Sequence, residues 1–231
     1  MKKFNIQFTK KEIILWSFSV LMIIISFVAF SRDGIITFVA SLIGVTAIII
    51  NAKGNPTGQA LMIIFSILYG IISFKCAYYG EMVTYLGMTA PMAVAALVSW
   101  LRNPYGDGQE VEVNHIKKSE ILFILAMSVI VTLMFYFILK LFNTSNLIAS
   151  TLSVMTSFIA VYLTFRRSTF FSLAYAINDI VLVILWGLAS LDDLSYISVM
   201  VCFLMFLIND IYAFISWHRM EVRQNKQKNH C

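Results

Sequence analysis

The feature that most constrains this chain is a run of apolar residues near its middle, from Ser119 to Phe142. Its stretch from Ile121 to Leu139 carries no charged side chain and is long enough to cross a bilayer as a helix, which takes about 20 residues. Three apolar runs precede it, three follow it and one lies further upstream. These runs cover about 34–50, 58–79 and 83–101, then 147–165, 170–190 and 194–217, with the extra run at 13–30. The pattern predicts an all-α polytopic membrane protein with eight transmembrane helices in a 1 + 3 + 1 + 3 order.

Composition supports this fold class and excludes a soluble one. Hydrophobic residues make up 60% of the 231 positions and charged residues only 13%, whereas about 25% charged residues is typical of soluble domains. Eight helices of about 20 residues account for most of the chain. We therefore expect a single integral membrane domain over 1–231 whose surroundings are the lipid bilayer, and we do not interpret the net charge of +5 as a sign of nucleic-acid binding.

The basic residues predict the orientation of the chain in the membrane. When ends and loops are counted alternately, most Lys and Arg residues fall on one side: in both tails, in or near the loop at 102–118 and at 166–167. The other side receives Arg32, Lys75 and Lys140. By the positive-inside rule, both termini are predicted to be cytoplasmic, which agrees with an even number of spans.

The two groups of three runs resemble each other. One shift of the sequence aligns 69–70, Tyr-Gly, with 186–187, Trp-Gly, and also aligns the Ser-Trp pairs at 99–100 and 216–217. A single helix between two three-helix units leaves both units in the same orientation, so we expect a parallel repeat, an architecture found in transporters. The predicted segments are an N-terminal tail and extra helix at 1–32, a first repeat at 33–102, a linker and central helix at 103–142, a second repeat at 143–219 and a cytoplasmic tail at 220–231.

Two Asn-Asp pairs lie inside apolar runs, Asn178-Asp179 and Asn209-Asp210. Each Asn is about 12 Å from the cytoplasmic end of its helix at a rise of 1.5 Å per residue, so the pairs lie at one depth. An ionisable side chain there costs about 2.5–3.5 kcal/mol and normally faces a cavity or a partner. The pairs predict a binding site, with one residue of each pair facing it. The structural alternative is that these groups only hold helices together.

Aromatic residues accompany these pairs. Trp186 lies about two turns beyond Asn178, Tyr212 follows Asn209 by three positions, and Tyr69 comes from the other half. Aromatic rings together with amides and carboxylates suit a flat heterocycle that carries a hydroxylated sugar. An Asp in such a site can also offset a cationic ring.

Catalytic and metal chemistry have little support in the sequence. The histidines His115, His218 and His230 fall in loops or in the tail, and there is no HExxH motif and no P-loop. We therefore expect no enzyme activity, no cofactor and no metal ligands. Two alternatives stay open: an intramembrane enzyme that uses Asp179 and Asp210, and a membrane sensor or scaffold that transports nothing.

Several motifs resemble the Pnu family of vitamin-precursor transporters, which includes the bacterial nicotinamide riboside transporter. The resemblance covers about 33–219, and its most specific part is the Tyr-Gly-Glu-Met stretch at 79–82. The other motifs that carry it are Tyr69-Gly70, Ala77-Tyr78, Tyr85, Pro91-Met92, Ser99-Trp100, Asn178, Trp186, Tyr196-Ile-Ser198 and Trp217-His-Arg219.

The resemblance implies a 3 + 1 + 3 core like that of the SWEET proteins, often with an extra N-terminal helix, and a homotrimer. It implies facilitated diffusion (uniport) of an unphosphorylated vitamin precursor across the bacterial inner membrane, driven by phosphorylation in the cytosol. Other members carry thiamine, riboflavin or deoxynucleosides. The sequence departs from the family at Asn209-Asp210, where members have apolar residues, so these substrates stay open beside nicotinamide riboside.

The hypothesis is a transporter of nicotinamide riboside whose halves rock around a site in the membrane. Asn178, Asn209 and Asp210 are expected to bind the ribose hydroxyls or the carboxamide, and the aromatic residues are expected to hold the ring. The resemblance implies pocket roles for Asn178, Trp186, Tyr69 and Gln59, although a solvated Gln59 is equally consistent with its position. The predicted substrate-binding set is Asn178, Trp186, Asn209, Asp210, Tyr212, Tyr69, Gln59 and Asp179.

Overall fold

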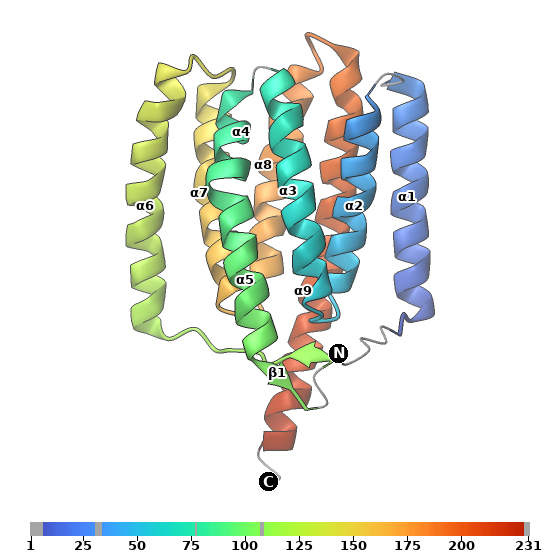
Figure 1. The fold of residues 1–231 in the computed structure, drawn as a ribbon, viewed down its shortest axis with the longest axis vertical. Coiled ribbons are helices and arrows are strands. Elements are labelled where there is room, and N and C mark those ends of the chain that lie inside the picture. The colour runs from blue at the N-terminus through green and yellow to red at the C-terminus, as the bar shows by residue number, and fades with distance from the viewer. Residues whose placement is uncertain (1–6, 31–33, 77, 107–108, 229–231) are drawn as a thin grey trace.

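Apolar helices make up almost the whole of the computed structural model, which describes residues 7–30, 34–76, 78–106 and 109–228 (Figure 1). Seven helical segments in these ranges are long and apolar enough to cross a membrane, and α2 is a shorter apolar helix of 17 residues. The helices are α1 Lys10–Phe30, α2 Ile35–Asn51, α3 Thr57–Lys75, α4 Tyr79–Thr84, α5 Ala90–Arg102, α6 Lys118–Leu141, α7 Leu147–Phe165, α8 Phe171–Ala189 and α9 Ile197–Lys228. The predicted all-α polytopic fold is confirmed.

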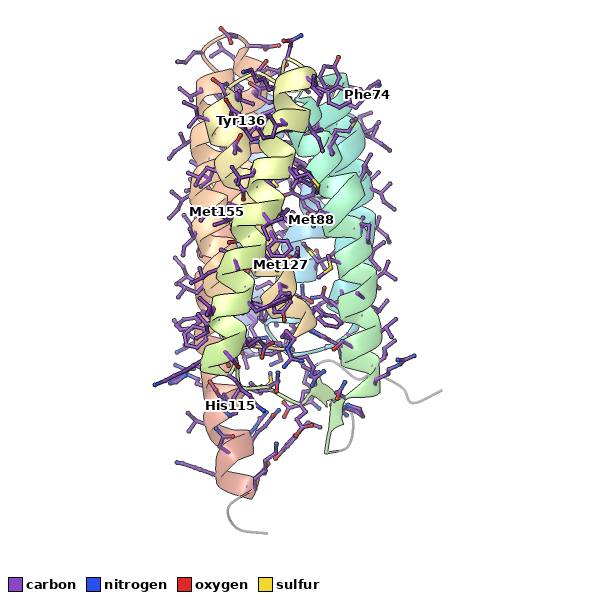
Figure 2. All side chains as sticks on the ribbon, turned by 90° about the vertical axis from the view of Figure 1, so that its left-hand side faces the viewer. Phe74, Met88, His115, Met127, Tyr136 and Met155 are labelled. Carbon is purple, nitrogen blue, oxygen red and sulfur yellow. The ribbon has the colours of Figure 1, made fainter. Side chains whose placement is uncertain are left out.

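Six of the spans form a closed ring. In order around the ring, α2 contacts α3, α3 contacts α5, α5 contacts α7, α7 contacts α8, α8 contacts α9, and α9 returns to α2. Two helices lie outside it: α1 packs on α2 and α9, and α6 packs on α7 (Figure 1). Many apolar side chains of these outer helices are exposed on the outside of the bundle, among them Ile14 of α1 and Leu122 of α6. Figure 2 shows α6 in front of the other helices. The ring therefore has an enclosed centre formed by both halves of the chain.

A π-helical turn, η1 Tyr85–Thr89, joins α4 to α5 within one span. Pro91 follows it in the first turn of α5 and has no backbone N–H to donate. A proline inside a membrane span interrupts the regular helix, and the wide turn just before it accommodates that interruption. The turn places Tyr85 and Thr89 among the buried residues at the centre of the ring.

The two halves make matching contacts at one end of the bundle. Trp100 Nε1 donates to the carbonyl of Thr164 at 2.9 Å, and Trp217 Nε1 donates to the carbonyl of Asn51 at 2.7 Å. Ser99 Oγ donates to the Phe165 carbonyl, and Ser216 Oγ donates to the Ala52 carbonyl. The two indole rings contact each other, with centroids 5.2 Å apart. Reciprocal contacts of this kind are what an internal repeat predicts, whereas the parallel arrangement of the repeats stays a prediction.

The linker between the halves closes over this same end, which we call the linker end (Figure 1). Its strands β1 Pro104–Tyr105 and β2 Glu110–Val111 form a short antiparallel hairpin. The predicted tail at 220–231 continues α9 as far as Lys228, because Gln224 accepts from the Val113 N–H at 2.9 Å and donates to the Val111 carbonyl at 3.0 Å. The helix is thus extended by its contacts with the linker.

Helices α1 and α9 respectively begin and end at the linker end, which fits the predicted common side for both termini (Figure 1). Which side of the membrane this is stays a prediction. Arg32 and the lysines at 2–3, which entered the charge count, and Ala77 of the family-like motif lie outside the described residues.

Candidate functional site

A small cavity lies at the centre of the ring, lined by residues of α2, α3, η1, α8 and α9. Its volume is about 20 Å³, enough for about one water molecule, so the helices are closed around it. The polar side chains that line it are Asn51, Thr89, Tyr85, Tyr175, Asn178, Asp179 and Asp210. The apolar ones are Ile48, Met62, Phe65, Phe171, Phe203 and Phe206. Residues of both halves of the chain therefore line the cavity.

The two carboxyl groups predicted to lie at one depth meet in this cavity. Asp179 on α8 and Asp210 on α9 are only 3% and 4% exposed, and both line this cavity. The second oxygen of Asp179, Oδ2, is buried without a hydrogen-bond partner. Among the described residues that line the cavity there is no Lys, Arg or His to balance these groups.

Asn178 is held in place by two hydroxyl groups of α7. Its Oδ1 accepts from Thr156 Oγ1 at 2.7 Å and from Ser157 Oγ at 3.0 Å. Because both hydroxyls use the amide oxygen, the amide orientation is fixed, and no described residue accepts a hydrogen bond from its Nδ2. Asn178 therefore offers an amide donor at the cavity wall.

An aromatic layer forms behind the cavity wall toward the end opposite the linker end. Tyr69 lies against two of the lining rings, with centroid distances of 4.3 Å to Tyr85 and 5.2 Å to Phe203. The indole of Trp186 donates to the Tyr69 hydroxyl at 2.6 Å. Tyr69 and Trp186 thus meet as the sequence grouping implied, one layer away from the closed cavity.

Gln59 is also one layer removed. It is buried, and its Nε2 donates to Asn51 Oδ1 at 3.0 Å. Asn51 in turn lines the cavity as the last residue of α2. Gln59 is therefore not solvated, and it contacts the cavity through Asn51.

Asn209 and Tyr212 lie on the other side of α9, against α1. Asn209 Nδ2 donates to Ser19 Oγ at 2.8 Å, and the Tyr212 hydroxyl donates to Glu12 Oε1 at 2.9 Å. Neither residue lines the cavity. Successive residues of a helix project about 100° apart, so Asp210 can face the cavity while its neighbour faces α1. A direct role of Asn209 and Tyr212 in binding stays a prediction.

Several polar residues that line the cavity or lie near it were absent from the predicted set, among them Tyr85 and Thr89 of η1. Tyr175 precedes Asn178 by one helical turn, a spacing that could have identified it. Asn51 is the last residue of α2 and is followed by a Gly/Pro-rich segment, so its position in the sequence gives no sign that it lines the cavity. Glu81, which belongs to the family-like motif at 79–82, is fully buried, accepts from Ser153 Oγ at 2.9 Å and has an unpartnered Oε2.

The described residues contain no group of three or more His, Cys, Asp or Glu side chains that could hold a metal ion. What the cavity does offer is an amide donor, hydroxyls, two carboxyl groups and aromatic rings. Such a set can recognise an organic molecule that has both a ring and hydroxyl or amide groups.

Comparison with known proteins places this geometry in context. A sequence model of the family described as nicotinamide mononucleotide transporter matches residues 34–219. The chain is similar to the nicotinamide riboside transporter PnuC of Neisseria mucosa, with 22% identity over 204 residues that cover 86% of this chain and 77% of that protein. Its fold is similar to that of a crystal structure of the vitamin B3 transporter PnuC, with a TM-score of 0.82, 20% sequence identity and 94% coverage of both chains.

Proposed function

The chain belongs to the nicotinamide mononucleotide transporter family, and on that premise we propose that it carries nicotinamide riboside into the bacterial cell. The predicted membership in the Pnu family is confirmed. This is a family of membrane transporters, so the chain is not an enzyme. The observation that carries the proposal is the closed polar and aromatic cavity at the centre of the helix ring.

The cavity has groups that suit each part of the riboside. Asn178 and the carboxyl groups of Asp179 and Asp210 can bind ribose hydroxyls and the carboxamide, since carboxylates accept and amides both donate and accept. Tyr69 and Trp186 support the aromatic wall against which the pyridine ring packs. Gln59 positions Asn51. The proposed contacts omit Asn209 and Tyr212 because α1 covers both.

Transport requires the ring to open alternately toward each side. The linker end is closed by the indoles of Trp100 and Trp217 with Phe171, whose ring lies 4.8 Å from that of Trp217. The other end is closed by the layer that contains Tyr69 and Trp186. We propose that the two halves rock about the cavity to open these layers in turn, without coupling to an ion or to ATP. Phosphorylation of the riboside in the cytosol would keep net flow inward.

The proposed setting is the bacterial inner membrane, with the linker end and both termini in the cytoplasm. Basic residues at that end, such as Lys10, Lys11, Arg102 and Arg166, support this orientation. We also propose a homotrimer, as the family resemblance implies. Light scattering of the purified protein would test that assembly by its mass.

Ligand binding to the purified protein in detergent tests the proposal, with calorimetry as the readout. The panel is nicotinamide riboside, nicotinamide, the mononucleotide, thiamine, riboflavin and a deoxynucleoside. We expect the riboside to bind and its phosphate not to bind. Binding of thiamine, riboflavin or the deoxynucleoside alone would keep the carrier and replace the substrate. No binding across the whole panel by folded protein would contradict the proposal.

A further inference from the structure

We infer that the Asp179–Asp210 pair makes this transporter selective for substrates whose ring carries a single positive charge. The inference deepens the proposed function and rests on it, because it names the class of substrate that the same cavity accepts. Nicotinamide riboside belongs to that class, since its pyridine nitrogen is bonded to the sugar and is therefore cationic.

The pair lies in a cavity where some buried polar atoms have no hydrogen-bond partner. The two carboxyl groups come from neighbouring helices, line one small cavity and are almost fully buried. Asp179 Oδ2 has no partner. Thr89 Oγ1, from η1 in the other half of the chain, also lines the cavity, is 3% exposed and lacks a partner. Buried polar atoms are nearly always hydrogen-bonded, so two unpartnered oxygen atoms on residues that line the same cavity indicate that a ligand binds there.

The position of the two carboxyl groups limits the charge of the pair. Both are almost fully buried and line the same small cavity. Two ionised carboxylates that share such a cavity at low dielectric repel each other strongly, so at least one of them is protonated. The pair therefore carries at most one negative charge.

No other group of the described structure offsets that charge. The titratable side chains that face the pair are Tyr85 from η1, Tyr175 from α8 and Cys202 from α9, and each is neutral when protonated. The lining residues of α2 and α3 carry no titratable group. Glu81 of α4 is bound to Ser153 of α7 and does not line the cavity.

A monocationic ring balances the one negative charge that the pair can carry. A neutral ring provides no counter-charge for an ionised carboxyl group, and a phosphate group adds negative charge beside the pair; both are costly inside a membrane protein. The aromatic lining supports the same selection, because ring faces attract cations. If the two Asp residues only joined α8 to α9, the charge of the ligand would make no difference.

The matched ligands for the test are nicotinamide riboside and its reduced 1,4-dihydro form, which has the same sugar and carboxamide but a neutral ring. Binding of both to the full-length protein in detergent is measured by calorimetry. We expect the cation to bind at least about tenfold more tightly. As the pH is lowered, the pair takes up a second proton, so binding of the cation should weaken.

Variants separate the charge of the pair from its structural role. Asp210→Asn leaves Asp179 as one carboxylate, so the preference for the cation should persist. The double variant D179N/D210N has no charge, and its preference should fall to about equal binding of the two forms. The control is D192N/D193N, which removes two exposed carboxylates of the loop after α8 and should behave like the wild type.

The outcomes are distinct. Equal binding of the cationic and neutral forms by the wild type would overturn the inference and leave the proposed function intact, as would an unchanged preference in D179N/D210N. No binding of either form by the wild type would overturn both. If the double variant does not fold, the ligand comparison and the pH series on the wild type still decide the inference.

Discussion

At the scale of single residues, the two asparagines of the Asn-Asp pairs have different partners. Asn178 faces the cavity and is fixed by two hydroxyls of α7, whereas Asn209 binds Ser19 of α1. We expect Asn178→Leu to lower the affinity for nicotinamide riboside at least about tenfold by removing the amide donor. Asn209→Leu should lower stability by about 1–3 kcal/mol, the cost of leaving a buried partner unpaired, with little change in affinity.

Calorimetry and thermal unfolding of both variants check this difference. They are matched because each replaces a buried amide by an apolar side chain of similar size on neighbouring helices. A loss of affinity in Asn209→Leu as large as that in Asn178→Leu would instead support the direct binding role predicted for Asn209 from the sequence.

The indole of Trp186 supports the aromatic wall through one hydrogen bond to Tyr69. Trp186→Phe keeps an aromatic ring but leaves the buried Tyr69 hydroxyl without this donor, so we expect a loss in riboside affinity of about 1–3 kcal/mol, measured by calorimetry. The control is Trp16→Phe, which removes the indole donor to Thr46 Oγ1 between α1 and α2. Equal losses in the two variants would show that the effect is not specific to the wall.

The depth and spacing of the Asn-Asp pairs pointed to Asn178, Asp179 and Asp210, all of which line the cavity. The sequence analysis expected one residue of each pair to face the site, whereas both Asn178 and Asp179 line the cavity. Tyr212 shares a face with Asn209, but that face points to α1, and hydropathy does not say which side of a helix an extra span covers. The sequence therefore predicted the polar positions better than their directions.

At the scale of elements, α2 and α9 approach closely at Gly44. A Cβ there would lie 2.2 Å from a ring carbon of Phe206 and 3.0 Å from one of Phe65, and both rings line the cavity. Gly44→Ala should push these rings aside, reduce riboside affinity and destabilise the fold by about 1–3 kcal/mol. Calorimetry and thermal unfolding are the measurements.

Gly187→Ala is the matched control for this prediction. A Cβ at Gly187 meets only the Met200 sulfur at 3.5 Å, an ordinary contact, so the substitution should be well tolerated. Tight riboside binding by Gly44→Ala would contradict the idea that this approach of α2 to α9 shapes the cavity.

The order and bounds of the membrane helices were predictable because apolar runs of about 20 residues have few alternatives in a bilayer. The extension of α9 to Lys228 was not predictable in the same way. It depends on Gln224 and its partners in the linker, which are more than a hundred residues away in sequence. Charged stretches give no periodic pattern that would specify such a contact.

At the scale of the whole molecule, the ring of six helices unites both halves of the chain around one cavity and closes it at both ends. The sequence predicted the shared site from the order of the spans. It could not predict the closed state, because a cavity of about 20 Å³ depends on how aromatic side chains pack across the ring. In the proposed transport cycle, substrate enters the cavity only when one of the two closing layers opens.

The most direct test of transport is flux of labelled nicotinamide riboside into liposomes that contain the purified protein. We expect saturable uptake that stops at equilibrium. Unlabelled riboside should inhibit this uptake, and the mononucleotide should not. An enclosed kinase with ATP should convert this into continued accumulation. Riboside uptake no faster than in protein-free liposomes, from protein shown to be folded, would contradict the account.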